Sequence, residues 1–104
     1  NRMPAYWMAR SRINNQENYS KYTALVGDIL KQYGGKPLSR GGRYQMMEGP
    51  DYFQRFVIVE FPTFEDAVAC FESDGYKAAA AHRRDGSGEV ETVIMDATEG
   101  MGAN

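Results

Sequence analysis

The chain has 104 residues and a formal net charge of -2, with 12 basic and 14 acidic side chains, which is the size of one domain with one modest core. Both signs of charge are mixed along the sequence, and this excludes the basic field that attracts nucleic acid and the polybasic run that attracts a membrane. One cysteine, Cys70, excludes an internal disulfide, and with the single His82 it argues against a structural zinc site.

The first predicted element is a strand over residues 5–13, apolar at its start and polar toward its end. Asn14 or Asn15 is then expected to cap a helix. Apolar and aromatic side chains recur at three- and four-residue steps along one face of that helix: Tyr19, Tyr22, Val26, Ile29, Leu30 and Tyr33. The pair Gly34-Gly35 should end the helix, because glycine readily adopts the left-handed conformation found at helix ends.

A second strand is expected over residues 36–48, and a turn follows at residues 49–51. The strand contains the pair Gly41-Gly42, which we interpret as a bulge or a close approach of the backbone. The turn carries Gly, Pro and Asp, the residue types that tight turns favour. We therefore expect the chain to return antiparallel as a hairpin.

The central strand is predicted over residues 55–62, because this is the longest apolar and β-branched run and it ends at Pro62. Glu60 lies inside the run, where a carboxylate is costly unless it is paired, protonated or in contact with water. Counting equally outward from Pro50 places Arg40 opposite Glu60, although a bulge at the glycines would shift that register.

Thr63 is expected to cap a second helix in the manner of a capping box with Asp66. The buried face of this helix is predicted at Phe64, Ala67, Val68 and Phe71. Ser73 begins a further turn of helix, and the residues that share one side of it are Tyr76, Ala79, Ala80 and Arg83. The last strand is expected over residues 89–96, and residues 98–104 should form a flexible tail or lie over a neighbour.

The order strand, helix, strand, strand, helix, strand predicts one α+β domain over residues 1–104, with a ferredoxin-like four-stranded antiparallel sheet and helices on one face. Side chains of a strand point alternately to the two faces of the sheet, and in the central strand both sets are mostly apolar. Both faces of the sheet should therefore avoid water. Two helices cover only one face. We therefore expect a homodimer in which two sheets face each other, with a cavity between sheet and partner or between sheet and helices.

Several short motifs resemble the domain of unknown function 1330 (DUF1330) family of small bacterial proteins: Tyr33-Gly34-Gly35, Arg40-Gly41-Gly42, Glu48-Gly49, Val59-Glu60-Phe61-Pro62 and Ser73-Asp74-Gly75-Tyr76. The resemblance extends from Met3 to about Ala97. It implies the dimeric α+β barrel superfamily, whose members include cofactor-free monooxygenases, muconolactone isomerases and haem-binding dismutases. A fold shared by such different proteins does not select one chemistry.

Glu60 and Arg40 are the candidate catalytic pair, in which Arg would orient a carboxylate or enolate and Glu would act as a base. The alternative is that the two side chains only neutralise each other across the hairpin. Ligand contacts are expected from four further side chains, each of which core packing or helix-end charge also explains: Tyr22, Tyr76, Arg83 and Tyr6. His82 is expected to be solvated, and Cys70 to be inert.

Three functions fit these observations. The first is a cofactor-independent enzyme, similar to a monooxygenase or isomerase, acting on a small aromatic or carbonyl compound. The second is a ligand-binding dimer without turnover, and the third is a purely structural dimer. We expect no metal or cofactor, no nucleic-acid or membrane partner, and, because no signal-peptide pattern or membrane-length apolar run is found, a cytoplasmic location.

Overall fold

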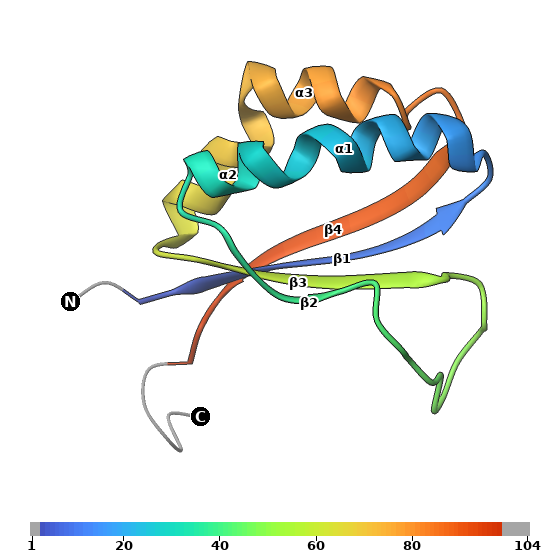
Figure 1. Cartoon of the computed structure of the whole chain (residues 1–104). Helices are drawn as coiled ribbons and strands as arrows, with labels where there is room; N and C mark the ends of the chain where they lie inside the picture. The colour runs from blue at the N-terminus through green and yellow to red at the C-terminus, as the bar shows by residue number, and fades with distance from the viewer. Residues whose placement is uncertain (1–2, 99–104) are drawn as a thin grey trace.

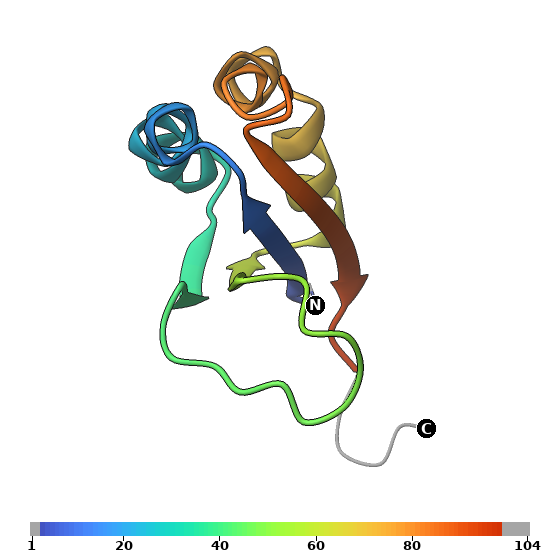
Figure 2. The same cartoon turned by 90° about the vertical axis from the view of Figure 1, so that its right-hand side faces the viewer.

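A computed structural model of the chain describes residues 3–98 (Figure 1), so most of the predicted flexible tail, residues 98–104, lies outside the described residues. The elements follow one another in this order: β1 (Ala5–Ile13), α1 (Gln16–Gln32), β2 (Lys36–Arg40), β3 (Arg55–Phe61), α2 (Phe64–Glu72), α3 (Asp74–Ala81) and β4 (Gly88–Asp96). The strands form one antiparallel sheet in the order β2-β3-β1-β4. The helices lie over one face of that sheet (Figures 1 and 2), which confirms the predicted α+β ferredoxin-like fold.

Side-chain caps determine where the helices begin. Asn15 caps α1, Thr63 caps α2 and Ser73 caps α3, each by accepting a hydrogen bond of 3.1–3.2 Å from the backbone N–H three residues later. Ser73 has an extended backbone, and this separates the second helical segment into α2 and α3. At the end of α1, Gly34 has a φ of +83°, the left-handed conformation that the sequence predicts there.

The second strand is much shorter than predicted, because β2 ends at Arg40 and residues 41–54 form a loop without helix or strand. Gly41, with a φ of +67°, turns the chain out of the strand. The loop lies on the side of the sheet away from the helices (Figure 2) and reaches β4, where the hydroxyl of Tyr52 donates a 2.6 Å hydrogen bond to Glu89. β2 and β3 pair antiparallel, as predicted, but the long loop over residues 41–54 joins them in place of the tight turn expected at residues 49–51.

The register between β2 and β3 also differs from the prediction. Glu60 is opposite Lys36, and Arg40 is opposite Val57, because the register shifts within β2 just after Pro37 and a long loop replaces the tight turn. Side chains alternate along β3, so Arg40 shares the helix-covered face with Val57, whereas Glu60 lies on the other face. The predicted pairing of Arg40 with Glu60 is therefore wrong.

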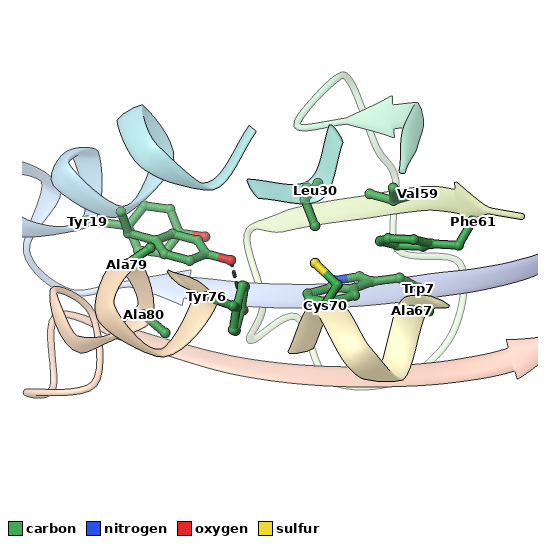
Figure 3. Close-up of a cluster of buried hydrophobic side chains, with 11 residues drawn as sticks. Trp7, Tyr19, Leu30, Val59, Phe61, Ala67, Cys70, Tyr76, Ala79 and Ala80 are labelled. Atoms are coloured by element: carbon green, nitrogen blue, oxygen red, sulfur yellow. Dashed lines mark hydrogen bonds between the residues drawn. The ribbon is translucent and has the colours of Figure 1, made fainter. Parts of the chain in front are cut away.

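The core lies between the helices and the sheet, and Trp7 stands at its centre (Figure 3). The Trp7 ring is stacked on Phe61 with 5.8 Å between ring centroids and meets the edge of Tyr76 at 5.2 Å. Aromatic pairs in these arrangements add to the free energy of burial. The sulfur of Cys70 and the side chain of Ala67 complete this layer from α2.

The sheet face turned away from the helices, here called the open face, remains partly exposed. Met8 on β1 and Val93 and Met95 on β4 are 38%, 55% and 49% exposed, and they lie on adjacent strands. Such a group of apolar side chains on one surface typically marks an interface. The described residues alone thus leave apolar sheet surface uncovered.

Candidate functional site

A cavity of about 320 Å³ lies between α1 and the helix-covered face of the sheet. Its sheet side includes Trp7, Val57 and Val59, and its helix side includes Tyr22 and Gly27. Gly27 contributes to the space, because a Cβ placed there would meet no atom within 4 Å. Glycine inside a helix costs about 0.5–1 kcal/mol relative to alanine, so the chain keeps this opening at the expense of helix stability.

Behind Tyr22 runs a chain of buried hydrogen bonds. The Nη2 of Arg83 donates to the hydroxyl oxygen of Tyr76 at 2.8 Å, and the hydroxyls of Tyr76 and Tyr22 are 3.0 Å apart. Arg83 is 5% exposed and Tyr76 is fully buried. The Arg83 guanidinium also lies 4.8 Å from the ring centroid of Tyr22, so the cation contacts both phenols.

The donors and acceptors of Arg83, Tyr76 and Tyr22 limit how these hydrogen bonds can be oriented. An arginine only donates, so the Tyr76 oxygen accepts from Arg83. The Tyr76 proton then needs an acceptor, and among the described residues the Tyr22 oxygen is the one within hydrogen-bond distance. When Tyr76 donates to Tyr22, the hydroxyl proton of Tyr22 is free for an acceptor in the cavity. The arrangement therefore offers a hydrogen-bond donor at a residue that lines the cavity.

Tyr22 remains protonated at physiological pH. Burial raises the pKa of the Tyr22 hydroxyl well above its ordinary value, the neighbouring Tyr76 raises it further, and Arg83 offsets only part of this rise. A phenol with a raised pKa donates a hydrogen bond but does not act as a general base. Tyr22 can therefore stabilise an oxygen that carries negative charge.

The predicted site residues do not form one site. Tyr22 and Arg40 both line the cavity. Tyr76 and Arg83 are buried behind Tyr22 and reach the cavity only through it. Glu60 lies on the open face, opposite Tyr6 of β1, and neither residue lines this cavity.

The cavity residues that the sequence analysis did not single out include Gly27 and Arg55. Gly27 is the one glycine inside α1, and a glycine within a strongly periodic helix is a signal that could have found it. Arg55 begins β3 and gives no comparable signal, because its contact with Gly41 depends on the path of the long loop.

His82 is exposed at the end of α3, and burial raises the pKa of the Cys70 thiol to about 11.

A second hollow, of about 510 Å³, lies on the open face. Met8, Phe56, Ile58 and Val93 give it an apolar floor. At its edge Arg10 forms a 2.8 Å ion pair with Glu91 on the neighbouring strand. Both members of this pair are more than half exposed, so the pair adds little stability.

Within residues 3–98, no cluster of three or more His, Cys, Asp or Glu side chains is arranged to hold a metal ion. No helix of this part of the chain is both long and apolar enough to cross a membrane.

The fold defines a class, the ferredoxin-like α+β proteins, in which helices cover one face of a four-stranded antiparallel sheet. Within that class the chain belongs to the family described as "Domain of unknown function (DUF1330)", which matches residues 4–98. The resemblance inferred from the glycine-containing motifs is thus confirmed. No curated protein matches the chain.

Several solved structures share the fold. A protein of unknown function from Rhodopseudomonas palustris is 18% identical, with a TM-score of 0.76 over 96% of this chain and 86% of that one. SnoaB, a cofactor-independent oxygenase from Streptomyces nogalater, is 11% identical, with a TM-score of 0.61 over 96% and 98%. A hydroxynitrile lyase from Passiflora edulis is 13% identical, with a TM-score of 0.65 over 97% and 99%. At these identities the likeness shows the fold alone.

Proposed function

We propose that this protein is a homodimer that binds a small aromatic or carbonyl compound in the cavity between α1 and the sheet. The observation that carries the proposal is the hydroxyl of Tyr22, whose hydrogen-bond partner among the described residues is the hydroxyl of Tyr76 and which belongs to a residue lining that cavity. Ligand pockets typically combine apolar walls with a few placed polar groups. Here Trp7, Val57 and Val59 supply such walls.

The size of the cavity limits the ligand. At about 320 Å³ it is near the lower end of small-molecule sites, which begin at roughly 300 Å³. A compound with one ring fits this range. Its carbonyl, phenolic or enolic oxygen would accept the hydrogen bond from Tyr22.

The homodimer is supported by the open face. Met8, Val93 and Met95 expose apolar surface there, and Phe56 and Ile58 extend the same surface across β3. A second copy of this face is apolar in the same way, and a twofold interface is self-complementary by construction. The family resemblance implies the dimeric α+β barrel superfamily, which is named for such sheet-to-sheet pairing.

A second candidate is a cofactor-independent enzyme of the monooxygenase or isomerase type, and the buried Arg83–Tyr76–Tyr22 chain favours it. A positive charge relayed through two phenols strengthens a donor aimed at a developing oxyanion. In this reading Arg40 orients the ligand from the cavity wall. Glu60 would act only in a site made at the sheet-to-sheet interface, because it lies on the open face.

A thermal-shift screen against phenols, quinones, small carbonyl compounds, carboxylates and haem tests the proposal. A true ligand raises the midpoint temperature of thermal unfolding, and the rise increases with ligand concentration. Gly27→Leu fills the cavity and should abolish the shift, whereas Ala24→Leu, on an exposed position of the same helix, should leave it unchanged. Silence across all classes would favour a structural dimer, and a shift that survives Gly27→Leu would reject the cavity as the binding site.

A further inference from the structure

Two arginines line the cavity at the side formed by β2 and β3. Arg40 is exposed at the end of β2, and Arg55 is half-buried at the start of β3. The two residues lie in the same part of the cavity wall, because the guanidinium of Arg55 lies against Gly41, the residue that follows Arg40. A Cβ at Gly41 would collide with that guanidinium. The glycine therefore makes the room in which Arg55 reaches β2.

Neither guanidinium has an acidic partner within residues 3–98. Among the described residues, the ion pair within 4 Å joins Arg10 to Glu91, and the side chains of Arg40 and Arg55 donate no hydrogen bond to the protein. The described residues that line the cavity include no Asp or Glu. Two like charges directed to one cavity repel each other, and an anion between them removes that cost.

Resting on the proposed function, we infer that the cavity binds an organic anion, a one-ring carboxylate whose carboxylate group is held by Arg40 and Arg55. A guanidinium presents a planar fork that matches the two oxygens of a carboxylate. The ring of the ligand extends from this group toward the apolar wall of Trp7 and Val59. A ring substituent with an acceptor oxygen would meet Tyr22.

Benzoate and benzamide provide a matched pair of probes, because they have nearly the same shape and differ in charge. Calorimetric titration should show that benzoate binds about 100-fold more tightly than benzamide, which is the loss expected for two charged hydrogen-bonded contacts of about tenfold each. Arg55→Gln and Arg40→Gln should each weaken benzoate by about tenfold and benzamide by much less, because only the carboxylate is charged. Raising the salt concentration should weaken benzoate alone.

The control is Arg84→Gln, which removes an exposed arginine at the end of α3 that does not line the cavity, and it should change neither affinity. Arg55→Lys keeps the charge without the fork and should bind benzoate at an intermediate strength. Arg40 is exposed, so Arg40→Gln retains the test even if a change at Arg55 impairs folding.

Equal affinities of the wild type for the two probes, with both lost in Gly27→Leu, would overturn the anion inference and leave the proposed function standing. Benzoate binding that survives both Arg→Gln changes would overturn the inference as well. Failure of the wild type to bind benzoate would also overturn the anion inference. The proposed function falls with it only when the wider ligand screen is also silent.

Discussion

The guanidinium of Arg83 donates a 2.8 Å hydrogen bond to the hydroxyl of Tyr76, so that a buried cation is held by a phenol. No carboxylate among the described residues forms an ion pair with Arg83, and its Nε atom is buried without a hydrogen-bond partner. Desolvation therefore opposes burial of this charge, and the Tyr76 oxygen is its direct compensation. Substitutions of Tyr76 and of Arg83 should therefore change the free energy of unfolding by different amounts.

Removing the phenol should be costly. Tyr76→Phe keeps the ring but takes away the acceptor of a buried charge, and we expect the free energy of unfolding to fall by about 2–3 kcal/mol. Tyr22→Phe, which leaves the Arg83–Tyr76 bond intact, should cost about 1 kcal/mol. Urea unfolding at one fixed protein concentration measures both. Equal stabilities of Tyr76→Phe and wild type would contradict the role assigned to Tyr76.

Removing the cation should cost less. Arg83→Met replaces a buried charge with an apolar side chain of similar length, and such replacements are often close to neutral. The hydroxyls of Tyr76 and Tyr22 can still bond to each other across 3.0 Å. We expect Arg83→Met to be at least about 1 kcal/mol more stable than Tyr76→Phe in the same urea experiment. The reverse order would show that Arg83 is a net stabilising group.

The thiol of Cys70 gives a pH dependence with a definite sign. Burial raises the pKa of this fully buried thiol from 9.0 to about 11, so the folded state holds its proton to higher pH than the unfolded state does. Stability that is complete below pH 9 is then lost as the pH rises toward 11. The urea midpoint should fall over this range.

The matched variant is Cys70→Ala, whose urea midpoint should fall less steeply between pH 9 and 11. Its stability at pH 7 is a separate matter, because removal of the sulfur leaves a small void. Comparison of the slopes therefore isolates the ionisation. Identical slopes for the two proteins would show that the folded pKa of Cys70 is close to its unfolded value.

Two adjacent glycines should respond differently to alanine. Gly41→Ala places a Cβ at a φ of +67° and against the guanidinium of Arg55, and we expect it to lower the free energy of unfolding by about 1–2 kcal/mol. Gly42→Ala meets no atom within 4 Å and should change stability by less than about 1 kcal/mol. Denaturant unfolding of the pair checks this. A similar effect at both positions would contradict the left-handed backbone conformation of Gly41.

The open face should control association. The wild type is expected to sediment as a dimer at micromolar concentration, and Val93→Arg should convert it to a monomer, because it places a charge within the apolar face. Leu25→Arg is the control, since Leu25 is 47% exposed on α1, away from that face. A monomeric wild type would remove the homodimer from the proposal.

The element types followed from the sequence because their signals are local. A side chain such as Asn15 or Ser73 caps the backbone only three residues away, and the apolar repeat of each helix spans a few turns. The family resemblance likewise rests on short motifs. The sequence analysis also indicated Tyr22 and Arg40, both of which line the cavity, but it placed Arg40 opposite Glu60 in a register that β2 and β3 do not adopt.

By itself, then, the amino-acid sequence determined the order of the elements, the helix starts and the excess of apolar sheet surface. Only the tertiary structure decided which side chains share a cavity. Gly27 and Arg55 come from separate elements, and their meeting depends on the register of β2 against β3 and on the course of residues 41–54. A shift of one residue in a strand moves a side chain to the other face of the sheet, and no local pattern fixes that shift across a long loop.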